Sequence, residues 1–494
     1  MMSSPSSKLS LIRDTVFYSG SNVVVQGISF FLAIFVRRSL GPEAFGVWTL
    51  LQVYLTYISY TNFGIFGAIY REIPVLRGRG EESKIESIKN TGFSYVITSS
   101  IVVGILMITG TFVFKNRLSE PVFFGLLTLA GLNLLQRANN FQIRILYTDK
   151  KFILASKFKI YSALVNAFLC VACVWFYHLY GLYLATLLSF VYNIIYLYSA
   201  QSFQWTWQWD RNELKSLMWF GLPLVGLNAA TKFLYTFDKL LIGKYLGFKA
   251  LGTYSIATLA SSYLYMIPNM FLIVLFPRTL EKFGEENKTA REKYSLLPSQ
   301  AICLYFSLAI GISWLAIPYI CSIFLPKYVE GIPSLKILMM GALFMTLSDQ
   351  MSHLLLGYKR HLWTLPVMGV LSLLLWLGSY ITLQWGGKMV YIAACSSVGL
   401  FILYLFSAYF ALRPLYSADR IFQEISKNIL PVFLSVLVLV LLDALTMDLS
   451  FFTILLKLVF FICFYIMFIL CIEKKSPVIH YVRAAYIEWR AAEY

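Results

Sequence analysis

The chain has 494 residues, of which 59% are hydrophobic and only 13% charged, and its formal net charge is +17. A water-soluble fold of this length could not bury so much apolar surface, so the composition excludes a soluble globular protein. The apolar runs are about twice the length of a β-barrel strand, which is roughly ten residues. The sequence therefore predicts an all-α membrane protein that crosses the bilayer many times.

Apolar runs of bilayer-crossing length recur along the chain and predict about fourteen transmembrane helices joined by short connections. Lys and Arg are concentrated in alternate connections, on the side that also holds both ends of the chain. By the positive-inside rule, we expect a multi-pass protein of the cell (inner, cytoplasmic) membrane with both termini in the cytoplasm. The predicted spans are 15–36, 46–70, 91–114, 122–147, 158–178, 181–200, 217–243, 250–277, 298–323, 334–358, 362–384, 388–411, 428–447 and 450–471.

One motif occurs twice, at Leu40–Leu50 and at Leu246–Ile256, with the pattern L-G-x-x-A-[FL]-G-x-[WY]-[ST]-[LI]. Each copy follows one apolar span and opens into the next. A repeat whose unit contains several spans is typical of transporters built from two similar bundles. The spacing predicts two six-helix bundles of the same orientation, 1–205 and 206–412, followed by two additional helices and a cytoplasmic tail in 413–494.

Polar side chains form stripes on several of the predicted spans. Ionisable groups inside a membrane are costly and usually face a cavity or a partner. The seventh span carries four polar residues at i, i+4, i+7 and i+11, which would lie on one face of a continuous helix: Asn228, Lys232, Tyr235 and Lys239. The repeat offset maps the first three onto the first span, at Asn22, Gln26 and Ser29. The fourth span has the same spacing in Asn133, Arg137, Asn140 and Arg144.

These stripes predict a hydrated cavity between the bundles. Its four basic residues would suit a phosphate or pyrophosphate, with Lys232 and Arg137 nearest the middle of the membrane. Arg144 lies near a span end, where its side chain could equally reach the headgroups. Three further residues are candidates for ion coupling, although a structural ion pair or hydrogen bond explains them as well: Asp238, Asp349 and His353.

Two common chemistries have no motif in this chain. The P-loop pattern G-x-x-x-x-G-K-[ST] is absent, and so is the zinc motif H-E-x-x-H. The sequence therefore predicts no cofactor and no metal site. Transport would depend on an ion gradient, the membrane potential or the gradient of the cargo.

Three short motifs carry a resemblance to a known family: the turn Leu40-Gly41-Pro42-Glu43-x-Phe45-Gly46, the segment Arg71-Glu72-Ile73-Pro74, and Asp238-Lys239-x-x-Ile242-Gly243 running into the second copy of the repeat. In these stretches the chain resembles the polysaccharide transporter family, the lipid-linked oligosaccharide (O-antigen) flippases of the multidrug/oligosaccharidyl-lipid/polysaccharide (MOP) flippase superfamily. The resemblance covers the first two spans and the seventh and eighth.

The resemblance implies an alternating-access transporter rather than an enzyme. Its cargo would be an undecaprenyl-pyrophosphate-linked oligosaccharide, which moves from the cytoplasmic to the outer leaflet with its pyrophosphate in a cationic cavity. The peptidoglycan-precursor branch is expected to carry cationic residues in the first span, where this chain has Asn22, Gln26 and Ser29, so a surface-polysaccharide cargo is favoured. Other expected partners are membrane lipid and a polysaccharide polymerase or export machinery, with no role for nucleic acid.

Two alternatives remain open at this stage. A multidrug or cation antiporter of the same superfamily should have an acidic cavity. A membrane glycosyltransferase or polymerase would need acidic catalytic residues on a sizeable outer loop, and the predicted outer connections are short.

Overall fold

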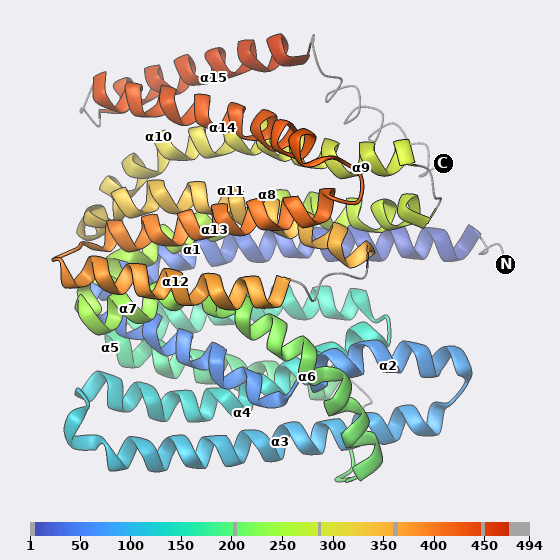
Figure 1. Cartoon of the computed structure of the whole chain (residues 1–494). Helices are drawn as coiled ribbons and strands as arrows, with labels where there is room; N and C mark the ends of the chain where they lie inside the picture. Colours follow the sequence, from blue (N-terminus) through green and yellow to red (C-terminus); the bar gives the residue numbers. More distant parts are fainter. Residues whose placement is uncertain (1–4, 201–204, 285–287, 359–363, 446–449, 474–494) are drawn as a thin grey trace. The chain divides into compact units, whose positions relative to one another are not determined.

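The computed structural model describes residues 5–200, 205–284, 288–358, 364–445 and 450–473, and within these ranges every regular element is a helix (Figure 1). The predicted all-α class is confirmed. The helices are α1 (Pro5–Ile58), η1 (Ser59–Asn62), α2 (Ile65–Arg79), α3 (Glu82–Val113), η2 (Lys115–Arg117), α4 (Glu120–Thr148), α5 (Phe152–Ala200), α6 (Arg211–Leu234), α7 (Phe237–Tyr245), α8 (Gly247–Gly284), α9 (Lys288–Ala301), η3 (Ile302–Phe306), α10 (Ser307–Phe324), η4 (Pro326–Gly331), α11 (Ile332–Gly357), α12 (Thr364–Gln384), α13 (Met389–Leu412), α14 (Ala418–Leu445) and α15 (Phe451–Glu473).

Eleven helical stretches within the described ranges are long and apolar enough to cross a membrane. Two of them contain 43 and 49 residues, about twice the length that one crossing needs. Each is interrupted by one residue outside the helical region of backbone space, Gly41 in α1 and His178 in α5. With these two stretches taken as pairs of spans, and with the 38-residue α8 added, the structure agrees with the predicted multi-pass membrane protein.

Both long helices reverse direction at their interruptions. In α1 the guanidinium carbon of Arg37 lies 4.1 Å from the ring centre of Phe45, eight residues later, which a straight helix would not allow. In α5 a Cβ on Gly181 would overlap the carbonyl oxygen of Cys173, also eight residues away. The predicted connections between spans one and two and between spans five and six are therefore tight turns.

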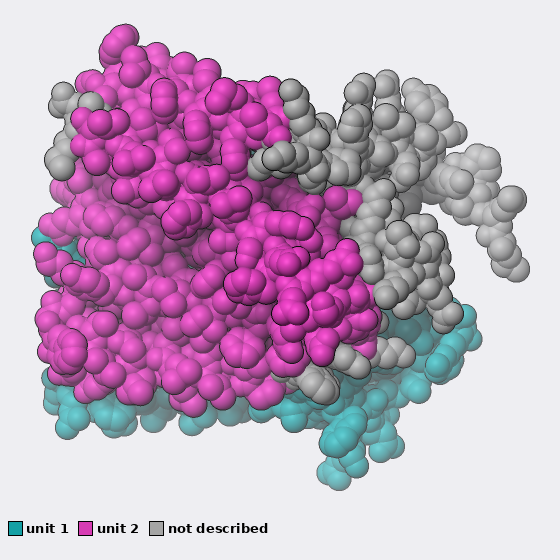
Figure 2. All heavy atoms as spheres, turned by 45° about the horizontal axis from the view of Figure 1, so that its top comes forward, with its two compact units in different colours: residues 1–232, 247–252 teal, residues 233–246, 253–494 magenta. Residues whose placement is uncertain are grey.

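The chain divides into two compact units (Figure 2). Unit 1 contains residues 1–232 and 247–252, and unit 2 contains residues 233–246 and 253–494. The finer division predicted from the repeat, into 1–205, 206–412 and 413–494, stays a prediction, and the tail from residue 474 lies outside the described residues.

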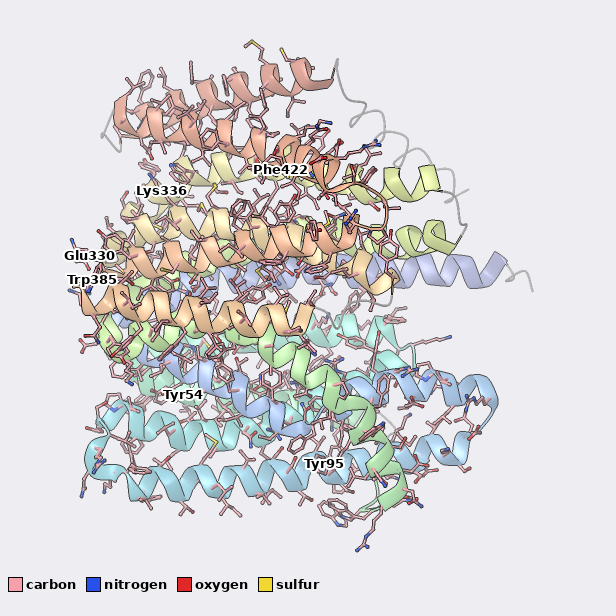
Figure 3. All side chains as sticks on the ribbon, in the orientation of Figure 1. Tyr54, Tyr95, Glu330, Lys336, Trp385 and Phe422 are labelled. Carbon is pink, nitrogen blue, oxygen red and sulfur yellow. The ribbon has the colours of Figure 1, made fainter. Side chains whose placement is uncertain are left out.

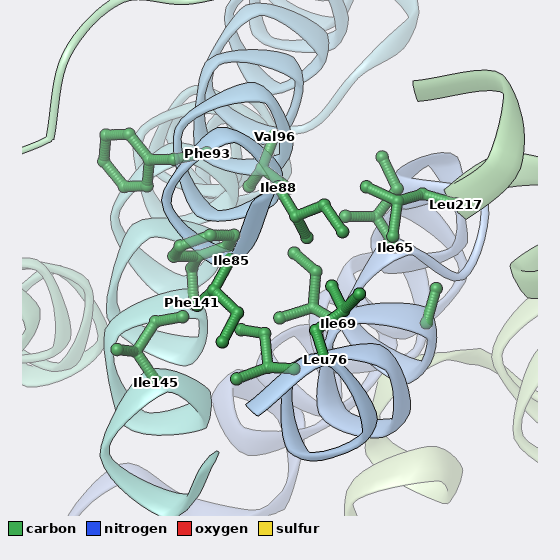
Figure 4. Packing of buried hydrophobic residues seen from close by; sticks show 12 residues of the cluster. Ile65, Ile69, Leu76, Ile85, Ile88, Phe93, Val96, Phe141, Ile145 and Leu217 are labelled. Carbon is green, nitrogen blue, oxygen red and sulfur yellow. The ribbon is translucent and has the colours of Figure 1, made fainter. Parts of the chain in front are cut away.

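Unit 1 has a hydrophobic core at the ends of α2, α3 and α4 (Figure 4). Ile65 and Ile69 of α2 pack with Val96 of α3 and Phe141 of α4, and Leu217 of α6 closes the cluster. All five are at most 1% exposed. Burying such side chains contributes about 1.5–3 kcal/mol each. The cluster fixes α4 against α2 and α3, next to the polar face of α4.

Residues 42–46 of the first copy of the sequence repeat and residues 248–252 of the second lie against each other within unit 1. The first glycines of the two copies, Gly41 and Gly247, have positive φ angles of 73° and 84°, which side chains disfavour. Their second glycines allow close approach, because a Cβ on Gly46 would overlap the carbonyl oxygen of Phe248 and a Cβ on Gly252 would overlap that of Pro42. The repeat offset maps one of these contacts onto the other, so the crossing is pseudo-symmetric.

Unit 2 contains an ion cluster that joins four helices. Asp443 of α14 accepts hydrogen bonds from Trp314 Nε1 of α10, at 2.8 Å, and from the Lys336 ammonium of α11. Lys336 is labelled in Figure 3. The ammonium of Lys457 of α15 lies 4.0 Å from its other oxygen. One carboxylate shared by several donors is well satisfied in a low-dielectric setting. The C-terminal helix pair is thus fixed to α10 and α11.

Candidate functional site

The second predicted span, 46–70, is broken near its end. α1 stops at Ile58, and the turn η1 is followed by Phe63 and Gly64, both with left-handed backbone (φ 47° and 78°). Gly64 lies so close to Gly221 of α6 that a Cβ on either would overlap the other's backbone. A broken helix leaves carbonyl groups without intrahelical partners, and inside a membrane these need another donor.

Arg137 of α4 supplies that donor. Its side chain is 2% exposed, and one terminal nitrogen donates both to the carbonyl of Ile58 and to the hydroxyl of Thr61. The other terminal nitrogen lies 3.4 Å from Ser99 Oγ, while the buried Nε–H has no acceptor. In the part of the chain that the structure describes, no carboxylate pairs with Arg137. It is therefore a buried, fixed positive charge with unused hydrogen-bonding capacity.

Arg137 lines a polar cavity of about 170 Å³ in unit 1. The cavity lies among the second half of α1, the break and α4, and none of the described residues that line it carries a carboxylate. Most of the lining groups are amides and hydroxyls, which can donate hydrogen bonds to an anion. The lining residues are Gln52, Leu55, Thr56, Ser59, Phe66, Asn133, Gln136, Arg137 and Asn140.

Three of the four residues in the predicted stripe on α4 therefore line this cavity, and the fourth does not. Asn133, Arg137 and Asn140 all line this cavity, and the Asn133 amide donates to the carbonyl of Ser100 at 2.9 Å. Arg144 does not line it. Its exposed guanidinium lies one helical turn further on, with its carbon 5.9 Å from the ring centre of Tyr70.

The polar residues of the predicted stripe on the first span are half-buried, and the ammonium group of a lysine from α5 lies beside one of them. Asn22 Oδ1 accepts a hydrogen bond of 3.0 Å from Lys159 Nζ of α5, and this ammonium lies 3.9 Å above the ring of Tyr18. Gln26 and Ser29 follow along the same helix. Sequence reasoning missed Lys159, although it lies just inside the predicted span 158–178, where any ionisable residue is notable.

The predicted stripe on the seventh span is wrong as one continuous face. α6 ends at Leu234 and α7 begins at Phe237, and Thr236 between them has a φ of −135°. The Asp238 carboxylate accepts the backbone N–H of Lys239 at 2.7 Å, and such local bonds favour helix ends over helix interiors. The break leaves the exposed Asn228 and Lys232 in unit 1 and places Tyr235, Asp238 and Lys239 in unit 2.

Asp238 has a well-defined structural partner. It is 5% exposed, and its second oxygen accepts a hydrogen bond of 2.6 Å from the Tyr254 hydroxyl, which is fully buried on α8. Because a buried carboxylate depends on such donors, this bond holds α7 against α8.

We expect Tyr254→Phe to lower the stability of the protein by about 2 kcal/mol, the cost of removing a hydrogen bond to a charged group. The measurement is the thermal unfolding midpoint in detergent, with Tyr391→Phe, an exposed tyrosine on α13, as the matched control. An unchanged midpoint together with lost transport would contradict the structural role and favour ion coupling at Asp238.

The remaining candidates for ion coupling lie in unit 2. The Asp349 carboxylate accepts a hydrogen bond from the Tyr265 hydroxyl of α8. His353 is half-buried one turn further along α11. These contacts place Asp349 in a helix-to-helix hydrogen bond, and its role in coupling stays a prediction.

Comparison with known proteins gives a family and a fold. Residues 35–333 match the family model described as "Polysaccharide biosynthesis protein", whereas no curated protein matches the chain. Among solved structures, the chain is similar to the inward-facing conformation of a multidrug resistance MATE family transporter of the MOP superfamily. The TM-score is 0.62 at 15% identity, with 81% of this chain and 94% of that chain covered.

Two further structures have the same fold. One is the outward-facing conformation of a multidrug resistance MATE family transporter of the MOP superfamily, with a TM-score of 0.57, 15% identity and coverage of 81% and 95%. The other is a MOP superfamily transporter from Pyrococcus furiosus, for which a binding pocket of reverse polarity is said to suggest a different function. Its TM-score is 0.55 at 16% identity, with coverage of 81% and 95%.

Proposed function

Because the chain belongs to the polysaccharide biosynthesis protein family and has the fold of the MOP-superfamily transporters, we propose that it flips a lipid-linked oligosaccharide across the cell membrane. The cargo is a polyprenyl-pyrophosphate-linked glycan of the undecaprenyl type, destined for a surface polysaccharide. It moves from the cytoplasmic to the outer leaflet by alternating access. Both chain termini lie in the cytoplasm, and the protein works next to a polysaccharide polymerase or export machinery.

One observation carries this proposal: the Arg137 guanidinium is buried without a carboxylate among the described residues, beside a cavity of amides and hydroxyls. A buried charge that lacks a counter-ion is costly. A pyrophosphate supplies two anionic groups and matches the planar fork of arginine. Asn133 and Asn140 offer hydrogen bonds to the phosphate or to the first sugar.

In the mechanism, the phosphate of the cargo competes with the groups that now accept hydrogen bonds from Arg137 for the guanidinium N–H donors. The guanidinium bonds to Ile58 and Thr61 at the break between α1 and α2. A bound phosphate takes over part of this hydrogen bonding and loosens the break. Discontinuous helices near the substrate site are a recurring device of transporters. The break would thus respond to the arrival of the cargo, while the lipid tail stays in the bilayer.

Two other functions are disfavoured by the same cavity. A drug or cation antiporter needs an acidic binding site, and the described lining residues of this cavity are neutral or basic. A glycosyltransferase or polymerase needs acidic catalytic groups, and the described lining residues of this cavity carry none. Lys232 and Lys239 remain candidate ligands of the pyrophosphate when the transporter changes conformation. Arg144, which is exposed and does not line the cavity, reaches the headgroups instead.

The test uses purified protein in liposomes that contain lipid-linked oligosaccharide. We expect the oligosaccharide to become accessible to a membrane-impermeant glycosidase on the opposite leaflet. Cationic dye should not move. Dye transport without oligosaccharide translocation would favour the antiporter, and elongation of the glycan from added sugar donor would favour the enzyme.

Lys159 is expected to assist binding of the same anionic headgroup. Lys159→Met keeps an apolar stem but removes the ammonium that lies over the ring of Tyr18. We predict that this change weakens cargo binding roughly fivefold to tenfold, as expected for one lost charge contact. Binding is measured by titrating the purified variant with lipid-linked oligosaccharide, with Lys157→Met, an exposed lysine on the same helix, as the control. Equal binding by both variants would contradict the assignment.

A further inference from the structure

The segment before α6, residues 205–210, is held against α3 by hydrogen bonds from alternate backbone N–H groups. The N–H of Thr206 donates to Asn90 Oδ1 at 3.1 Å, and the N–H of Gln208 donates to Ser94 Oγ at 3.2 Å. The N–H of Asp210 donates to Thr91 Oγ1 at 3.3 Å. Alternate residues of an extended segment point to the same side. Residues 206, 208 and 210 therefore present their N–H groups to α3.

The tryptophans occupy the other alternate positions. Trp205, Trp207 and Trp209 are 40%, 55% and 46% exposed. Their ring centres follow one another at 6.4 Å and 6.3 Å, and Trp205 packs on Phe93 of α3 at 4.8 Å. We call these three residues the tryptophan row. Tryptophan in such a row is typical of the boundary between the headgroups and the hydrocarbon of a membrane.

The composition of α3 places the row at this boundary. The helix has 32 residues, which is longer than the roughly 20 that cross the hydrocarbon. The residues beyond this length lie at the start of the helix, where the first eight positions include four charged residues: Glu82, Lys84, Glu86 and Lys89. The helix becomes apolar beyond Asn90 and Thr91. Because the segment is hydrogen-bonded to residues 90–94 of α3, the tryptophan row lies where the polar part of this helix ends.

The first turns of α6 continue the row with a basic and then an apolar face. Arg211 and Lys215 are one turn apart and exposed, and no ion pair is recorded for either within the described ranges. The neighbouring Glu213 faces Lys84 of α3 at 3.9 Å instead. The side chains of this face form a groove of about 370 Å³, lined by Arg211, Leu214, Lys215, Met218, Trp219 and Leu222.

We propose that this groove binds one anionic glycerophospholipid. Its phosphate lies between Arg211 and Lys215, and an acyl chain follows Leu214, Met218 and Leu222 along α6. The order of groups matches a lipid, with two positive charges at the headgroup level and apolar surface on the hydrocarbon side. Basic side chains at the headgroup level attract anionic lipids. Trp219 is 82% exposed, and tryptophan, with an apolar ring system and a polar N–H, suits a position between headgroups and hydrocarbon. The site is distinct from the Arg137 cavity.

Native mass spectrometry of the full-length protein in detergent tests the site. Phosphatidylglycerol and phosphatidylcholine with identical acyl chains serve as the probes. We expect at least one phosphatidylglycerol to bind more tightly than phosphatidylcholine. The double variant Arg211→Gln/Lys215→Gln should lose this preference by roughly tenfold or more, as expected for two basic residues at a membrane surface. The matched control is Lys115→Gln/Arg117→Gln, an exposed basic pair at the other end of α3.

A second measurement localises the lipid without relying on a variant. Phosphatidylglycerol with a photoactivatable acyl chain is crosslinked to the wild-type protein in nanodiscs, and the adducts are mapped by proteolysis. Adducts within 205–222 support the proposal. Adducts only elsewhere, or equal phosphatidylglycerol binding by both double variants, would overturn it. Preferential displacement by lipid-linked oligosaccharide would also overturn it, because the groove would then belong to the cargo. None of these readouts depends on translocation.

Discussion

Arg137→Ala is expected to reduce translocation of lipid-linked oligosaccharide by about a hundredfold. Hydrogen bonds to charged groups contribute about 1.5–3 kcal/mol each, so the loss of a bidentate contact to the pyrophosphate amounts to roughly 3 kcal/mol. The measurement is the initial rate of oligosaccharide appearance on the outer leaflet, divided by the amount of folded protein. That correction matters because Arg137 also bonds to Ile58 and Thr61 at the break.

Two matched variants separate the effect of the positive charge of Arg137 from the effect of its planar guanidinium geometry. Arg137→Lys keeps the positive charge but cannot hold two phosphate oxygens in one plane, so we expect partial activity. Arg144→Ala removes an exposed arginine of the same helix that does not line the cavity, and we expect a change of less than about threefold, within the range of a weak surface interaction. If Arg137→Ala retained normal translocation at a normal folded level, the cavity would not be the anion site.

Gly46→Ala and Gly252→Ala are each expected to destabilise the protein by about 1–3 kcal/mol, at the high end of this range. The added Cβ would overlap a backbone carbonyl, that of Phe248 or that of Pro42, and a backbone cannot move aside as a side chain can. The thermal unfolding midpoint in detergent and the folded yield measure the effect.

Gly110→Ala serves as the control for these variants, because a Cβ at this position in α3 has open space around it. We expect it to be neutral or slightly stabilising, since alanine favours a helix over glycine. The double variant Gly46→Ala/Gly252→Ala should cost less than the sum of its parts, because both residues belong to one crossing. Full additivity, or no loss in either single variant, would contradict the close approach.

Much of this fold could be predicted from composition and from one repeated motif. The apolar runs indicate membrane-spanning helices, and the glycines of Leu40–Leu50 and Leu246–Ile256 indicate tight turns. The contact between the two copies could not be predicted, because a repeat specifies similar local structure and says nothing about what packs against it. In the structure, the first glycine of each copy makes the turn and the second allows the crossing.

The helical spacing predicts which polar residues lie at one cavity only where the helix is continuous. α4 has no break between Asn133 and Asn140, so the helical spacing brings these residues and Arg137 to one cavity. The same spacing fails on the seventh span, because the chain leaves the helix at Thr236. Helix breaks inside apolar runs carry little sequence signal, since tertiary donors such as Arg137 stabilise them. Lys159 was missed for a related reason: its partner Asn22 lies 137 residues away.

The most direct test is the leaflet location of lipid-linked oligosaccharide in cells that lack this gene. A membrane-impermeant sugar-modifying enzyme reports which oligosaccharides are accessible from outside. We predict that the oligosaccharide accumulates on the cytoplasmic side, and that the wild-type protein restores its outward appearance whereas Arg137→Ala does not. Normal appearance on the outer side, in cells without another transporter for this cargo, would contradict the flippase function.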